Sequence, residues 1–105
     1  MNNQRRTQII KVAEAIREEA TKDILNRDII NMLINELDMY VEEERFALDN
    51  YPESLQETDR WEEYDDNCEE LSDIVMELND NMCEDDDDDV KVGLNDALED
   101  IECYL

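Results

Sequence analysis

One heptad pattern of apolar residues, in the second half of the chain, constrains the fold most strongly. Between residues 61 and 82 the apolar side chains recur at alternating steps of three and four residues, through three heptads. The members of this seam are Trp61, Tyr64, Cys68, Leu71, Val75, Leu78 and Met82. The spacing predicts a helix at about 54–82 with one apolar face, and such a face requires a second apolar helix to cover it.

A suitable partner helix is predicted just before the seam, at about 28–49. Its first half carries apolar side chains at helical spacing, namely Ile30, Leu33, Ile34 and Leu37. Pro52 ends this helix, because proline disfavours helical geometry in the residue before it. Ser54 and Glu57 have the spacing of a capping box that would begin the next helix. The two helices are therefore predicted to form an antiparallel hairpin with its turn at Asn50–Pro52.

Two shorter helices are predicted on either side of the hairpin. The first, at about 5–25, has an apolar stripe made of Ile9, Ala13, Ile16, Ala20 and Ile24. Asp28 is the expected cap of the helix that follows. The last helix, at about 90–103, turns inward the side chains of Leu94, Ala97, Leu98 and Ile101. Residues 84–89 are six consecutive acids, which we expect to form a solvated linker whose end favours the N-terminus of the last helix.

Glycine and proline, which punctuate turn-rich β folds, each occur once in the 105 residues. The predicted fold class is therefore all-α. We expect one domain over residues 1–105, a small helical bundle built on the antiparallel hairpin, with an N-terminal helix and a short C-terminal helix.

The net charge of −24 is distributed unevenly along the chain. Residues 1–27 carry six bases and four acids, whereas residues 28–105 carry three bases and 29 acids. The main body would repel phosphates, so direct binding to nucleic acid or to an anionic membrane is not expected. The weakly basic first helix is expected to dock against the acidic hairpin within the chain.

The side chains that most enzymes and metal sites need are missing. The chain has no histidine, which is the commonest general base and transition-metal ligand. A calcium-binding EF-hand loop beginning at Asp85 would need glycine and glutamate where Val90 and Asp96 stand. Three cysteines without CxxC spacing do not form a zinc motif. We therefore expect no enzymatic activity, no cofactor and no dedicated metal site.

The turn of the hairpin contains a longer pattern, which runs from Asp49 to Arg60 with the sequence DNYPESLQETDR. It resembles the DN-x-PE-x-LQ-x-[ST]-[DE]-R turn of small acidic helical-hairpin proteins from phages and mobile elements of Gram-positive bacteria. The resemblance covers about residues 30–82. It implies a helical hairpin and a mobile-element origin, and it transfers no catalytic or binding residue.

The cysteines and the N-terminus bear on location. An odd number of widely spaced cysteines (Cys68, Cys83 and Cys103) does not form a disulfide framework and favours a reducing compartment. Charged residues interrupt any signal-peptide core, and no apolar run is long enough to span a membrane. Together with the resemblance, these features predict the cytoplasm of a bacterial host cell.

The densest acidic face is predicted on the 54–82 helix. Residues 62–80 hold nine acids and no base: Glu62, Glu63, Asp65, Asp66, Glu69, Glu70, Asp73, Glu77 and Asp80. This segment spans roughly 28 Å as a helix, or about one charge per 3 Å, and one strand of B-DNA carries one charge per roughly 3.4 Å. Several of these acids stand four residues apart, which destabilises the helix. Such a cost indicates that the field itself is useful.

Two hypotheses for function follow. The first is a DNA mimic that uses this acidic face to block a basic, nucleic-acid-binding surface of a host protein, as an anti-CRISPR or anti-restriction protein of a phage would. The alternative is a helical adaptor or structural protein that binds a partner through an apolar helical seam. Tyr51 and Tyr104 are candidate interface aromatics for either hypothesis. The chain is expected to be a monomer or a homodimer.

Overall fold

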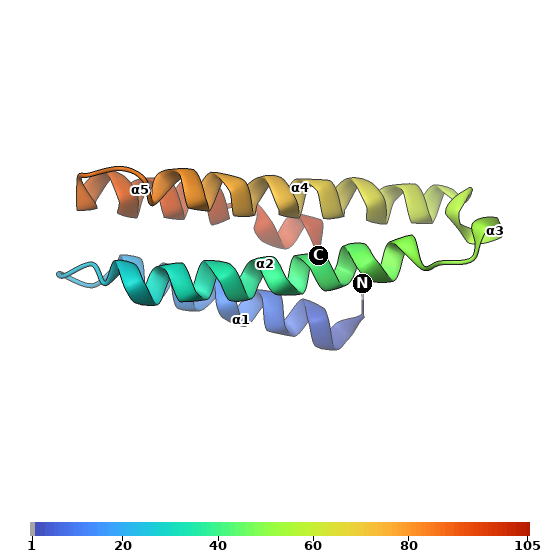
Figure 1. Cartoon of the computed structure of the whole chain (residues 1–105), viewed down its shortest axis with the longest axis horizontal. Coiled ribbons are helices and arrows are strands. Elements are labelled where there is room, and N and C mark those ends of the chain that lie inside the picture. The colour runs from blue at the N-terminus through green and yellow to red at the C-terminus, as the bar shows by residue number, and fades with distance from the viewer. Residues whose placement is uncertain (1) are drawn as a thin grey trace.

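The computed structural model describes residues 2–105, and its backbone consists of helices joined by short connections (Figure 1). The elements are α1 (Asn3–Ala20), α2 (Arg27–Asp49), α3 (Glu53–Gln56), α4 (Asp59–Asn81), α5 (Asp87–Leu98) and a short 3-10 helix, η1 (Ile101–Tyr104). No strand occurs within the described residues. The predicted all-α class, a small bundle with an N-terminal helix and a short C-terminal helix, is confirmed.

The four longer helices form a ring in which each is antiparallel to the next (Figure 1). Helix α1 packs on α2, α2 on α4, α4 on α5, and α5 returns to pack on α1. The bundle is elongated, with extents of 50 × 21 × 18 Å. The hairpin of α2 and α4 is longer than the other pair and extends beyond it toward α3, so that this end of the molecule has only two long helices (Figure 1).

The heptad seam is inside the bundle, as its spacing predicts. Cys68, Leu71, Val75 and Leu78 are buried, while Trp61, Tyr64 and Met82 are partly buried against the same core. The opposing helix α2 contributes buried apolar side chains at Ile30, Ile34, Leu37, Val41 and Leu48. Burial raises the pKa of the Cys68 thiol, because the thiolate would lose its hydration there. The other two cysteines are exposed, and all three are free.

The prediction for the end of the first helix is wrong. Helix α1 stops at Ala20, and Thr21 donates a hydrogen bond from its hydroxyl to the Glu18 carbonyl oxygen, 2.7 Å away, at the point where the chain turns. Once the helix has ended, the four-residue step to Ile24 no longer leads to the same face. Ile24 is therefore 86% exposed and Leu25 is buried in its place.

The predicted helix caps also differ from those in the structure. The side chain of Asn26, and not that of Asp28, caps α2 by accepting a hydrogen bond from the Ile29 amide at 3.2 Å. The Ser54 capping box does not form. The predicted 54–82 helix is divided into α3 and α4, and the hydroxyl of Thr58 caps α4 by accepting from the Trp61 amide at 3.2 Å.

The acidic linker is shorter than predicted. Asp86 caps α5 by accepting a hydrogen bond from the Asp88 amide at 2.8 Å, so residues 87–89 form the first turn of that helix. Two effects account for this. A helix N-terminus favours negative charge. In addition, the guanidinium of Arg27 binds the connection, with an ion pair to Asp87 at 2.8 Å and a hydrogen bond to the Glu84 carbonyl oxygen at 2.8 Å.

Gly93 lies where α5 comes close to α4. A Cβ atom at this position would stand 2.2 Å from the side-chain oxygen of Asn81. The glycine therefore costs α5 some helix propensity, and its missing side chain makes room for Asn81.

Candidate functional site: an acidic helical face

The outer face of α4 is an open row of carboxylates. Because the apolar seam points α4 into the bundle, the acids between the seam positions point to solvent. Eight of the nine predicted acids are exposed: Glu62, Glu63, Asp66, Glu69, Glu70, Asp73, Glu77 and Asp80. We call these eight the acidic face. None of them has an ion pair or a side-chain hydrogen bond to another residue within 2–105.

Asp65 differs from the other eight. It is only partly exposed and accepts a hydrogen bond from the guanidinium of Arg45 on α2. The same guanidinium lies 3.7 Å from the carboxylate of Asp49. This ion pair fastens α4 to α2 and neutralises the charge of Asp65. Asp65 therefore stabilises the contact between α2 and α4, and it adds no unpaired charge to the acidic face.

Helix α5 extends the acidic face sideways into a groove. Asp96 and Asp100 lie across from Glu70, Asp73 and Glu77, around a groove of about 170 Å³. Sequence reasoning missed Asp96, which is in α5, and Asp100, which lies in the turn after it. Their four-residue spacing places them on one side of a helix, next to the inward-facing Ala97. The sequence does not show that this side faces α4, so the groove could not be predicted.

Tyr104 forms part of the wall of this groove and is less accessible than predicted. It is partly buried and packs against the core, so only part of its side chain is open to an interface partner. The negative charge of Glu70 raises the pKa of the Tyr104 hydroxyl, and burial and the charge of Asp100 act in the same direction. The tyrosine thus reports the local field of the groove.

Glu70→Gln is expected to lower the pKa of Tyr104 toward the ordinary tyrosine value, because it removes the largest cause of the shift. A pH titration followed by NMR of the tyrosine ring carbons would resolve each phenol separately. Glu62→Gln is the matched control, since it removes a charge from the same helix two turns away and should leave Tyr104 unchanged. An unchanged pKa in Glu70→Gln would contradict the proximity of the two side chains.

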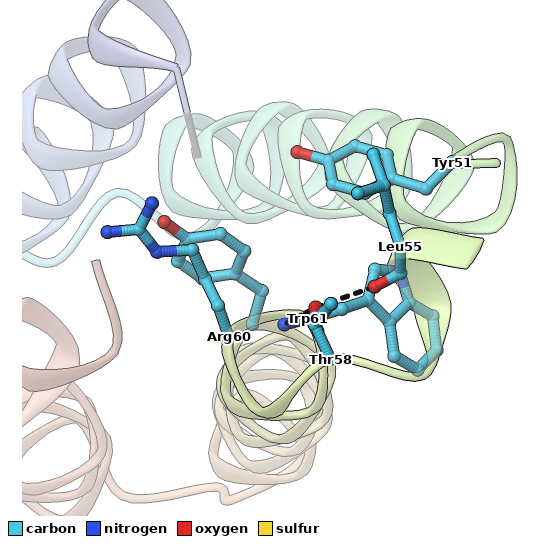
Figure 2. Close-up of a pocket in the computed structure, with 6 residues that line it drawn as sticks. Tyr51, Leu55, Thr58, Arg60 and Trp61 are labelled. Carbon is cyan, nitrogen blue, oxygen red and sulfur yellow. Dashed lines mark hydrogen bonds between the residues drawn. The ribbon is translucent and has the colours of Figure 1, made fainter. Parts of the chain in front are cut away.

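Tyr51 lies at the tip of the hairpin, where the structure has a second hollow (Figure 2). This hollow has a volume of about 330 Å³ and is lined by Tyr51, Leu55, Thr58, Arg60, Trp61 and Tyr64. Tyr51 is 36% exposed, so it stays a candidate interface aromatic. The indole N–H of Trp61 donates to the Leu48 carbonyl oxygen at 3.1 Å, which holds the tip together. Three of the six lining residues are aromatic, and none of the six belongs to the acidic face.

Two basic residues of α1, Arg5 and Arg17, act within the bundle, as expected for this helix. Arg5 forms a 2.6 Å ion pair with Glu44 of α2, and Glu44 is almost fully buried. Arg17 donates a hydrogen bond to the Leu98 carbonyl oxygen near the end of α5. Sequence reasoning missed the burial of Glu44. These cations fasten α1 to its two neighbours and lie away from the acidic face.

Other kinds of site find no support in the described part of the chain. Within residues 2–105, no group of three or more histidine, cysteine or acidic side chains is arranged to hold a metal ion. None of the helices there combines the length and the hydropathy needed to cross a bilayer. Comparisons with family models, with curated proteins and with solved structures found no match. The resemblance to phage hairpin proteins therefore depends on the turn motif alone.

Proposed function

We propose that this chain is a non-enzymatic binding protein whose acidic face occupies a basic, nucleic-acid-binding surface of another protein. One observation carries the proposal: eight exposed carboxylates share one face of α4, and none of them is paired with a cation within residues 2–105. Asp96 of α5 and Asp100, in the turn after it, widen this field.

The arrangement of charges favours binding over simple solvation. Ordinary helix surfaces mix signs and gain stability from pairs of opposite charge, as Arg45 and Asp49 do on α2. The acidic face instead places like charges four residues apart, for example at Glu69 and Asp73, which destabilises the helix. The cations of a basic partner would pair with these acids and offset their mutual repulsion. The same charges would attract the partner over several ångströms before contact.

The spacing of the charges favours a surface that normally holds a nucleic acid. Along α4 the eight open acids give about one charge per 3.5 Å, close to the roughly 3.4 Å per charge of one DNA strand. The hairpin turn motif supports the narrower version of the proposal, in which a phage or mobile element uses the protein against a bacterial defence system such as CRISPR or restriction. The place of action would then be the bacterial cytoplasm.

The adaptor hypothesis requires an apolar helical seam that a partner can reach, and the seam of α4 is not accessible. The seam of α4 is covered by other helices of the same chain, with Leu71 and Leu78 almost fully buried. A partner could not reach this seam without opening the bundle. Any apolar docking would have to use a different surface.

Capture from a bacterial lysate tests the proposal. The immobilised chain, exposed to a nuclease-treated lysate, should retain a protein that binds nucleic acid when tested by itself. A variant with neutral amides at Glu62, Asp66, Glu69, Asp73 and Glu77 should not retain it. Equal retention by the variant, or retention only of proteins that do not bind nucleic acid, would contradict the proposal.

A further inference from the structure

Helix α2 carries a row of exposed apolar side chains on the side away from the core. Met32 is 70% exposed, Met39 is 47% exposed and Phe46 is 72% exposed. They are seven residues apart, which is about two helical turns, so they lie in line over roughly 21 Å of the helix. We call these three residues the α2 stripe. Scattered exposed apolar residues need no explanation, but a regular line of three does.

Part of the stripe forms one wall of a groove. Met39, Phe46 and Ala47 line a groove of about 460 Å³ together with Arg5, Glu42 and Glu43. The groove exists because α1 begins at Asn3 and is held at that level by the Arg5–Glu44 ion pair. The last turns of α2 therefore extend past the beginning of α1 (Figure 1).

The charges beside the stripe restrict what can cover it. Glu42 and Glu43 line the groove, and Glu36 is exposed near Met39 on the same helix. Among the described residues that line the groove, Arg5 is the one cation, and it is already paired with Glu44. A complementary surface must be apolar along its centre and basic at its edges.

We propose that the α2 stripe binds a basic amphipathic helix of a partner protein. The apolar side chains of that helix would lie on Met32, Met39 and Phe46, and its lysine or arginine side chains would reach Glu42 and Glu43. A helix fits because the stripe is narrow, straight and repeats at heptad spacing. Methionines suit such a surface, because their flexible side chains adapt to different partners.

Two other occupants fit less well. A second copy of the chain would bring the same glutamates face to face, between molecules that each carry a net charge of −24. An anionic membrane would be repelled by the same acids. This inference uses a face of α2 and does not depend on the proposed role of the acidic face on α4.

A synthetic peptide tests the inference. The probe is a helical peptide of about 20 residues with leucine at the a and d heptad positions and lysine or arginine beside them. It should bind with one-to-one stoichiometry in a fluorescence anisotropy titration. Replacing Met32, Met39 and Phe46 together by glutamine should weaken binding at least tenfold. These side chains are exposed, so the fold should survive, which circular dichroism would verify.

Three controls separate this inference from its alternatives. Met76→Gln removes an exposed methionine of α4 and should leave binding unchanged. The chain with five neutralised acids on α4 should also keep binding the peptide, so failure of the proposed function would not affect this result. A scrambled peptide of the same composition should bind at least tenfold more weakly. Absence of binding, equal binding of the scrambled peptide, or a dimer of the chain that the glutamine substitutions abolish would each overturn the inference.

Discussion

Neutralising five acids of α4 together is expected to stabilise the fold and to remove binding to the basic partner. The substitutions are Glu62→Gln, Asp66→Asn, Glu69→Gln, Asp73→Asn and Glu77→Gln. They remove repulsive pairs such as Glu69 with Asp73, and each such pair destabilises the helix by about 0.2–0.5 kcal/mol. The free energy of unfolding should therefore rise by about 1 kcal/mol. Loss of the favourable position of Glu62 in the first turn of α4 offsets part of this gain. Urea denaturation would measure the change.

The effect on affinity should be much larger. Five exposed charge pairs at about 0.5 kcal/mol each correspond to a loss on the order of 100-fold in affinity. A matched control removes five exposed acids that lie off α4, namely Glu14, Glu18, Asp23, Glu53 and Glu57. It changes the net charge equally and should cost far less affinity. Equal losses in both variants would mean that net charge matters and the acidic face does not.

Arg5→Ala is expected to be the most destabilising change of a charged residue at the surface of α1. The ion pair with Glu44 leaves the two side chains 17% and 5% exposed, and Arg5→Ala removes the guanidinium from a carboxylate that stays buried. Losing this hydrogen-bonded ion pair should cost about 1.5–3 kcal/mol. Thermal or urea unfolding should show this loss.

Arg6 provides the matched control. It is the next residue of the same type, and it is exposed without an ion pair or hydrogen bond of its side chain to another residue within 2–105. Arg6→Ala should therefore change stability by less than about 0.5 kcal/mol. The double change Arg5→Met with Glu44→Leu should recover most of the stability, because apolar side chains can replace a buried pair. Similar losses for Arg5→Ala and Arg6→Ala would contradict the role of the ion pair.

The features that depend on helical periodicity could be predicted from the sequence. The alternating three- and four-residue steps from Trp61 to Met82 correctly predict the buried side of α4. The acids between these positions correctly predict its solvent-exposed side. Pro52 located the hairpin turn, because proline acts on the backbone directly. Each of these is a property of one helix and needs no knowledge of its neighbours.

The errors concern helix ends and contacts between helices. Asn26 and Asp28 are both good caps, and periodicity alone did not distinguish them. Glu44 continues the helical spacing of the buried Leu37 and Val41 and lies on the core side of α2. It was not predicted there because a charged side chain is expected at the surface. Asp65 depends on Arg45, which comes from another helix. Such pairs become visible only when the register between helices is known.

The central claim is that the acidic face takes the place of a nucleic acid on a basic protein. The most direct measurement is an equilibrium titration of the captured partner with this chain at increasing concentrations of duplex DNA and at constant ionic strength. The account predicts that the apparent Kd rises linearly with the concentration of free DNA, as it does when two ligands compete for one site. An apparent Kd that stays constant while the DNA is bound to the partner would show that the two occupy different surfaces and would contradict the account.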